Sequence, residues 1–319
     1  MVRGAKVLQR SYVLLPLVFG LAFLSACIAS PFVKILNDDL SKVRPLSRLF
    51  TRCLAAFALL YFLLFRRYMR SKVVASLNIH VSSVLKQLIA GLLIGIVALG
   101  LVIAVFYAAG AKRLDVTFTP QQIWTALLIG LGVAFVEEIV FRGVVLQNLQ
   151  ADMEAFFAVV FASALYAAMH FVDPLPNDVL KASEAPSFST FHILNGFRLV
   201  PYQLSNFSRF GEAWPFFVGL SLFGVVLAVA YIKAGSLYLP IGIHAGLIAV
   251  IKFDGALFDD VAGRSKLLFG VPRDWFMSYT DSLICWLMAV VLIVLLIAFG
   301  GKLRAHAAQG ARANARGKS

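Results

Sequence analysis

Three ionisable side chains stand inside an apolar stretch of the chain, the run ALLIGLGVAFVEEIVFRGVVL that covers 126–146. They are Glu137, Glu138 and Arg142. A charge at the centre of a membrane span costs roughly 2.5–3.5 kcal/mol on insertion scales. These groups must therefore pair with one another or face a wet cavity.

Helical spacing divides the three groups into two roles. Glu138 and Arg142 are four residues apart, so they share one helix face and can form an ion pair. Glu137 lies about 100° round the helix from Glu138 and projects elsewhere. The spacing predicts a buried strut made of Glu138 and Arg142, and a free carboxylate, Glu137, that points into the helix bundle.

Two histidines in other apolar runs add to this carboxylate. His170 stands in FASALYAAMHF and His244 in YLPIGIHAGLIAV. A carboxylate and an imidazole can take a proton from water and direct that water at a carbonyl, and the second imidazole can stabilise the oxyanion. Glu137, His170 and His244 could instead hold Zn²⁺, which accepts two His and one Glu and keeps an open position for water. Either arrangement hydrolyses an amide.

The elements that must position these residues are membrane-spanning helices. The 319-residue chain is 61% hydrophobic and 14% charged, whereas a soluble domain has about 45–50% apolar and about 25% charged residues. Long apolar runs indicate transmembrane helices. The sequence predicts an all-α, polytopic membrane helix bundle of about eight transmembrane helices that forms a single integral membrane domain, 1–319. The runs are 12–33, 51–65, 88–109, 123–147, 155–172, 214–232, 236–252 and 280–300. We interpret the first three as scaffold.

The net charge of +13 is interpreted through this membrane setting. The basic tail, 302–319, follows a span directly, and such a tail favours anionic lipid over nucleic acid. With eight spans both termini lie on one side, together with Arg66, Arg67, Arg70 and Lys72. We expect both termini to be cytoplasmic, and we expect the protein in the inner, plasma membrane of a bacterium. The partners expected are a membrane-associated peptide or protein substrate and anionic lipid, with no nucleic acid.

The longest connection between spans is the loop 173–213. It contains four prolines, and its aromatic and aliphatic residues at 188, 191, 194 and 197–199 have near-helical spacing. This pattern predicts a short helix lying at the membrane interface. Either the loop packs on the surface or it forms a lid over a cavity.

Several of these residues resemble the motifs of a known family. Glu137 to Arg142 matches EExxxR, Tyr166 to His170 matches an aromatic-xxx-His element, and His244 in PIGIHAG matches a third His element. Over about 120–252, the proposed catalytic core, the chain resembles the CAAX-protease and bacteriocin-processing (CPBP, or Abi) family of intramembrane proteases, which includes the Ras-converting CAAX endopeptidases.

The resemblance implies a role for each matched residue. Glu137 would be the catalytic carboxylate that activates water, and His170 would share that water. His244 would help to form the oxyanion hole. Supporting positions would belong to Glu138, Arg142 and Tyr166. The family is described both as glutamate-dependent and as metal-dependent; we favour the glutamic peptidase, which needs no cofactor, and keep the zinc metalloprotease as the alternative.

One position departs from the family pattern, which has Asn or Asp four residues after the third His. Here that residue is Ile248, and loss of one oxyanion donor can cost roughly 10²–10³ in rate. Either His244 with a backbone N–H suffices, or another polar group substitutes, or the protein is a poor protease. A further difficulty is depth, since Glu137 and His170 differ by ~7 Å along their helices. Gly143 is a candidate for a helix break that corrects this difference.

Two other function classes stay open from the residues alone. In a proton-coupled transporter the carboxylate and the histidines would form a proton relay, although no internal repeat of the kind transporters show is detectable. In a non-catalytic membrane scaffold the site would be incomplete. The apolar Ile248, at a position where a polar residue is expected, favours this class. The preferred hypothesis is an intramembrane endopeptidase.

Overall fold

The computed structural model describes residues 10–36, 46–70, 73–77, 81–114, 119–172, 194–204, 207, 210–261 and 282–316. Within these residues, five helices are long and apolar enough to cross a membrane, and three shorter helices are also apolar. The eight coincide with the eight runs expected from hydropathy, so the helical membrane bundle is confirmed. The chain is an integral membrane protein.

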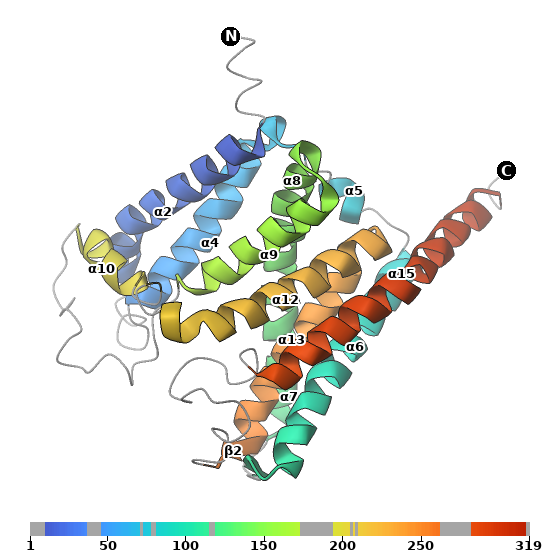
Figure 1. The fold of residues 1–319 in the computed structure, drawn as a ribbon. Coiled ribbons are helices and arrows are strands. Elements are labelled where there is room, and N and C mark those ends of the chain that lie inside the picture. Colours follow the sequence, from blue (N-terminus) through green and yellow to red (C-terminus); the bar gives the residue numbers. More distant parts are fainter. Residues whose placement is uncertain are drawn as a thin grey trace.

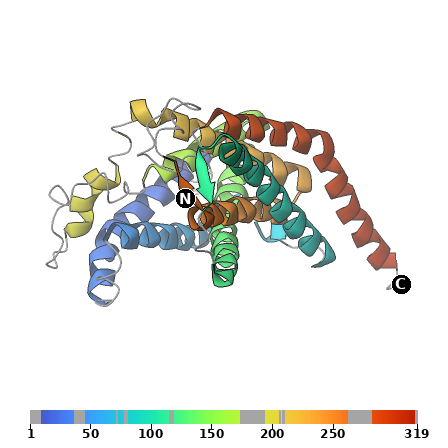
Figure 2. The ribbon, with the colours of Figure 1, turned by 90° about the horizontal axis from the view of Figure 1, so that it is seen from below.

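The helices form two groups on either side of a central pair (Figures 1 and 2). On one side α2 packs against α4, α7 and α13 lie in the centre, and on the other side α6 packs along α13 while α15 packs against α12. The helix α9 packs against α12. The bounds are α2 Ser11–Leu36, α4 Leu46–Leu64, α6 Val81–Ala108, α7 Pro120–Glu138, α9 Ala155–His170, α12 Phe210–Ala234, α13 Tyr238–Leu257 and α15 Leu283–Arg316.

Shorter elements connect these helices. A 3₁₀ turn and a short helix follow α4, and one two-stranded antiparallel pair, β1 with β2, joins the end of α6 to the end of α13. Their bounds are η1 Arg66–Tyr68, α5 Val73–Leu77, β1 Lys112–Leu114, η2 Ile139–Leu146, α8 Gln147–Asp152, α10 Asn195–Gln203 and β2 Phe258–Asp260.

The helix that carries the charged motif widens within the motif, after Glu138, so that Arg142 lies in the wider segment. The α-helical hydrogen bonding of α7 ends at Glu138, and η2 is a π-helix that contains Gly143. A π segment adds backbone to each turn and so shifts the residues before it relative to those after it. The expected break at Gly143 is therefore present as a change of helix type and not as a gap. The side-chain amide of Asn148, in α8, donates to the carbonyl of Val144, in η2, at 2.8 Å.

Glycines bring α6 and α13 into close contact. Gly91 and Gly95 of α6 face Gly242 and Gly246 of α13, and a Cβ on any of the four would meet backbone atoms of the other helix at 3.1 Å or less. Small residues four apart allow helix backbones to approach in membranes. His244 lies between the two glycines of α13, so this contact fixes the helix segment that carries it.

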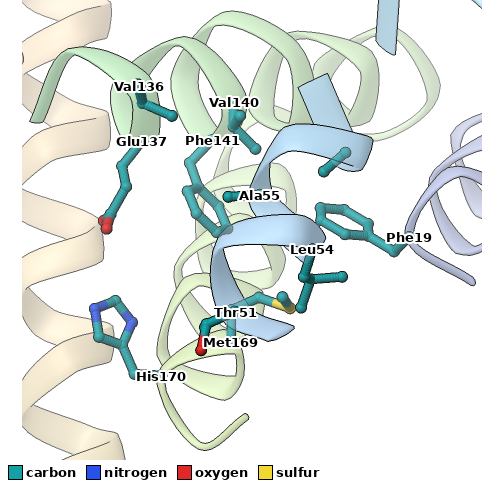
Figure 3. Close-up of a pocket in the computed structure, with 11 residues that line it drawn as sticks. Phe19, Thr51, Leu54, Ala55, Val136, Glu137, Val140, Phe141, Met169 and His170 are labelled. Atoms are coloured by element: carbon teal, nitrogen blue, oxygen red, sulfur yellow. The ribbon is translucent and has the colours of Figure 1, made fainter. Parts of the chain in front are cut away.

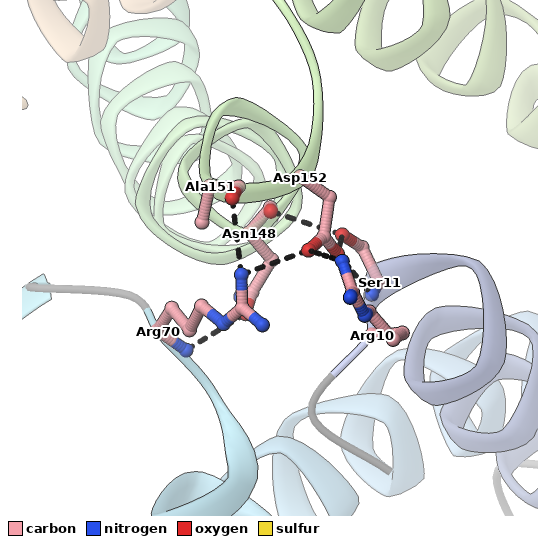
Figure 4. A network of polar contacts seen from close by, with 6 residues as sticks. All are labelled: Arg10, Ser11, Arg70, Asn148, Ala151 and Asp152. Atoms are coloured by element: carbon pink, nitrogen blue, oxygen red, sulfur yellow. Dashed lines mark hydrogen bonds and ion pairs between the residues drawn. The ribbon is translucent and has the colours of Figure 1, made fainter. Parts of the chain in front are cut away.

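A polar cluster ties α2 to the end of α8 (Figure 4). The Asp152 carboxylate accepts hydrogen bonds from the backbone N–H and the hydroxyl of Ser11, at the first turn of α2. It also binds Arg70 at 2.8 Å and Arg10 at 3.6 Å. The backbone N–H of Arg70 donates to Asn148. The cluster thus joins three chain segments at one end of the bundle.

The short helix expected in the longest loop is present as α10. Its backbone approaches that of α2, because a Cβ on Gly196 would overlap the carbonyl of Cys27. Leu199 is buried. The part of the predicted helical pattern at 188 and 191 lies outside the described residues, as do the side chains of the basic tail.

Candidate active site

The predicted strut between Glu138 and Arg142 is confirmed. Nη1 of Arg142 donates to Oε1 of Glu138 at 2.8 Å, and both side chains are buried, with 3% and 0% of their surface exposed. Nη2 of Arg142 donates to the backbone carbonyl of Gly224 on α12 at 3.1 Å. The guanidinium therefore links the motif helix to α12 and to the Glu138 carboxylate at once.

His244 is held by the same carboxylate. Its Nδ1 lies 2.8 Å from Oε1 of Glu138, and the ring is buried. An ionised carboxylate can only accept, so Nδ1 carries the proton in this contact. Nε2 points the other way and lies 3.8 Å from Oε2 of Glu137. A neutral His244 would therefore present a lone pair to Glu137, and a protonated one an N–H.

Glu137 occupies the place expected of a free carboxylate. It lines a cavity, and 29% of its side chain is exposed. Its Oε2 is buried without a hydrogen-bond partner among the described residues. An unpaired buried carboxylate oxygen is costly, and such exceptions to hydrogen-bond satisfaction call for a functional explanation.

His170 faces Glu137 at one end of this cavity (Figure 3). Its Nδ1 lies 2.9 Å from the backbone carbonyl of Tyr166, one turn earlier on α9. Because a carbonyl only accepts, Nδ1 is the donor and Nε2 of the neutral ring is an acceptor. This tautomer can take a proton, which is what a partner in water activation must do.

The Tyr166 ring separates and orients the charged groups. It is 4% exposed. The guanidinium carbon of Arg142 lies 4.8 Å from its centroid, within the range of a cation–π contact. The His170 ring packs edge-on at 4.6 Å between centroids, and the His244 ring at 6.2 Å. A single aromatic side chain thus contacts the strut and both histidines.

The cavity in front of Glu137 has a volume of about 220 Å³ and is mainly apolar. The residues that line it come from α2 and α4 on one side and from α7, η2 and α9 on the other. The lining residues are Phe19, Thr51, Leu54, Ala55, Ala58, Val136, Glu137, Val140, Phe141, Met169 and His170. From the sequence α2 and α4 are expected only as scaffold, and their part in this wall is not predicted. The apolar face 51, 54, 55 and 58 of α4 was the available signal, but it does not distinguish a cavity wall from packing.

Ile248 lies one turn after His244 on α13 and is half-buried. Ile248 packs near α7, since a Cβ added to Gly130 of α7 would lie 3.5 Å from the Cβ of Ile248. An aliphatic side chain donates no hydrogen bond, so this position gives no polar group to the site. Lys252, one further turn along, is exposed.

The fit of a metal ion can be judged from the donor set. Among the described residues, no three His, Cys, Asp or Glu side chains are grouped as a ligand set. The Nδ1 atoms of both histidines are engaged, with Glu138 and with the carbonyl of Tyr166, and metal-binding histidines are usually held by such contacts through the ring nitrogen that does not bind the metal. Glu137, His170 and His244 thus have the donor types of a zinc site but are not grouped as a three-ligand set among the described residues.

Comparison with known proteins adds one match. The family model for type II CAAX prenyl endopeptidase, Rce1-like, matches residues 119–250. This segment includes Glu137, His170 and His244, and it agrees with the 120–252 core expected from the motifs. No curated protein and no solved structure matches the chain.

Proposed function

We propose that the chain, whose residues 119–250 match the family model of Rce1-like type II CAAX prenyl endopeptidases, hydrolyses a peptide bond of a membrane-associated substrate with Glu137 as the base. The family supports an intramembrane endopeptidase. The observation that carries the residue assignment is the position of Glu137. Its unpaired Oε2 lies beside His244 and its carboxylate faces His170 at the end of a cavity.

The proposed reaction begins with a water molecule between Glu137 and His170. The Glu137 carboxylate accepts a proton from this water as the oxygen attacks the carbonyl carbon of the scissile bond. The unprotonated Nε2 of His170 holds the second hydrogen of the water and so orients its lone pair. The result is a tetrahedral intermediate with a negative oxygen. The proton on Glu137 then passes to the amide nitrogen, the C–N bond breaks, and a carboxylic acid and an amine leave.

We assign the stabilisation of the oxyanion to His244. Its Nδ1–H is committed to Glu138, so only a protonated ring presents Nε2–H to the oxyanion. The Glu138 carboxylate, which is also bound to Arg142, lies at hydrogen-bond distance from Nδ1 and so fixes the direction in which Nε2 points. A charged donor fixed in a site of low dielectric can contribute several kcal/mol to the transition state, of the order of 2.7–4 for one donor.

The surroundings of the site support a membrane substrate. The cavity wall is apolar, and helices with apolar, exposed outer faces surround it. Arg10, Arg66, Arg67 and Arg70 stand at the end of the bundle where α2 begins and α8 ends. The positive-inside rule favours the cytoplasm for such a cluster. We therefore assign this end and both termini to the cytoplasm, where the basic tail would meet anionic lipid.

The zinc-dependent version of the same protease is the alternative that the convergence of Glu137, His170 and His244 keeps open. These residues would need to move to form a ligand set with one open position, where zinc would lower the pKa of a bound water. A chelator distinguishes the two versions. Activity that is lost with a chelator and restored by Zn²⁺ would favour the metal-dependent enzyme.

The test uses the full chain, purified and reconstituted in liposomes that contain anionic lipid. A library of membrane-tethered peptides, with and without a prenylated C-terminal cysteine, is supplied in water enriched in ¹⁸O. The proposal expects cleavage that places one ¹⁸O atom in the new carboxylate and that persists in a chelator. Absence of cleavage of every peptide would contradict the assignment.

A further inference from the structure

Five of the eleven residues that line the cavity in front of Glu137 lie outside the segment matched by the family model. Phe19 comes from α2, and Thr51, Leu54, Ala55 and Ala58 come from α4. The four residues of α4 have the spacing i, i+3, i+4 and i+7, which places them on one face of the helix. This face closes the cavity opposite the motif helix, as Figure 3 shows for Leu54 and Ala55.

Packing holds this wall in a fixed place. The Phe19 ring contacts the Phe62 ring edge-on at 5.6 Å, which couples α2 to α4. At the N-terminus of α2, the backbone N–H of Ser11 donates a hydrogen bond to the carboxylate of Asp152 in α8. The wall is therefore joined to the helix that carries Glu137, and the distance between wall and carboxylate is set by the fold.

The size and chemistry of the cavity define what it can take. Its volume is about 220 Å³, and an engineered apolar cavity of about 150 Å³ admits benzene. There is room for one large apolar side chain, aromatic or branched aliphatic. The small residues Ala55 and Ala58 create this room, and the ionisable groups of the lining, Glu137 and His170, face each other at one end.

We propose that this cavity is a substrate subsite that binds one large apolar side chain next to the scissile bond, and that Ala55 sets its size limit. The proposal rests on the proposed function, because the cavity becomes a subsite only if Glu137 directs the hydrolysis. A side chain seated there places its own backbone at the open end, beside the carboxylate and His170. The preference for a large residue then comes from apolar burial, and a change of one methylene is worth about 10–200-fold in discrimination.

The experiment compares Ala55→Leu with a matched variant on the same helix. Ala55 is exposed into the cavity, and its neighbour Ala56 is exposed but does not line it. Each variant is reconstituted in liposomes, and kcat/KM is measured for peptides that carry Ala, Leu or Phe at either position flanking the cleaved bond. We expect Ala55→Leu to lower kcat/KM for Phe at one position by at least about 10-fold. The peptide with Ala at that position should be cleaved as well as by wild type, and Ala56→Leu should keep the wild-type preference.

A second measurement does not depend on cleavage. A peptide with the photoreactive analogue of leucine at the same positions is cross-linked to the Glu137→Gln protein, and the attachment sites are mapped. The subsite predicts attachment to Phe19, Leu54 or Met169, and at least a several-fold lower yield when Ala55→Leu is added. Cleavage by wild type with an unchanged preference in Ala55→Leu would overturn the subsite and leave the proposed function standing. Cross-linking elsewhere would also overturn it. Cross-linking to this wall without cleavage of any peptide by the wild-type protein would show that the cavity binds an apolar side chain, but it would overturn both the proposed function and the cavity's role as a substrate subsite.

Discussion

Nδ1 of His244 lies 2.8 Å from Oε1 of Glu138, the same oxygen that accepts a hydrogen bond from Arg142 at 2.8 Å. One buried carboxylate therefore fixes both a strut between helices and the ring of a proposed oxyanion donor. The second acidic residue of the motif is therefore engaged with Arg142 and His244, and for this reason we propose that Glu137 takes part in the reaction.

The first prediction concerns the stability of this strut. Replacing Glu138 with Ala leaves the Arg142 guanidinium buried without its carboxylate, and breaking a buried pair in this way costs about 3–5 kcal/mol. The free energy of unfolding, measured with denaturant in detergent micelles, should fall by this amount. The double variant Glu138→Ala/Arg142→Met should lose less than the single one, because no unpaired charge remains. A double variant that is less stable than Glu138→Ala would contradict the strut.

The second prediction concerns the contact between α6 and α13. A Cβ on Gly95 meets the backbone of α13 at 3.1 Å or less, whereas a Cβ on Gly100, in the same helix, has nothing within 4 Å. We expect Gly95→Ala to lower the thermal unfolding midpoint and the activity together, since His244 moves with α13. Gly100→Ala should leave both unchanged or raise stability by a few tenths of a kcal/mol. Equal behaviour of the two variants would show that the helices do not approach as described.

The third prediction concerns the polar cluster at the end of α8. Asp152→Ala removes an acceptor for Ser11 and for Arg70, and hydrogen bonds to a charged group contribute roughly 1.5–3 kcal/mol each. The free energy of unfolding should fall by at least the value of one such hydrogen bond, roughly 1.5–3 kcal/mol. Arg10→Ala is the control, because Arg10 is 53% exposed and lies 3.6 Å from the carboxylate. It should cost at most about 1 kcal/mol, and a larger loss than in Asp152→Ala would argue against the cluster.

The fourth prediction concerns Ile248. This residue lies one turn after His244 and offers no hydrogen-bond donor to the site. Ile248→Asn adds an amide on the face of His244, and one oxyanion donor is worth roughly 10²–10³ in rate. We expect kcat to rise by about 10-fold or more on a cleaved peptide. Ile248→Leu, which adds no donor, is the control. A loss of kcat in Ile248→Asn with an unchanged unfolding midpoint would show that the site is complete without this donor.

Features that depend on local spacing and hydropathy could be predicted from the sequence, and the charged motif is the clearest example. The pairing of Glu138 with Arg142 depends only on spacing along one helix, and the expectation was confirmed at 2.8 Å. The eight apolar helices likewise follow from hydropathy, because a bilayer leaves few alternatives to a helix. The short helix α10 was expected from periodicity within the loop.

Contacts between distant segments could not be predicted in this way. The bond from His244 to Glu138 joins residues 106 positions apart, and nothing in the local pattern specifies it. The wall of α2 and α4 was missed because an apolar helix face has the same pattern whether it meets lipid, a neighbour or a cavity. The four glycines of α6 and α13 did carry a signal, two small residues four apart in each helix. The π-helical form of η2 was anticipated only as a break at Gly143.

The most direct test of the central claim is the single-turnover cleavage rate of Glu137→Gln in liposomes, beside its unfolding midpoint. The account predicts a rate about 10²–10⁴-fold below that of wild type, since general base catalysis contributes that factor, with the midpoint unchanged. Glu154→Gln, at an exposed position before α9, should cleave as wild type does. A Glu137→Gln protein that cleaves as fast as wild type would contradict the assignment of Glu137 as the base.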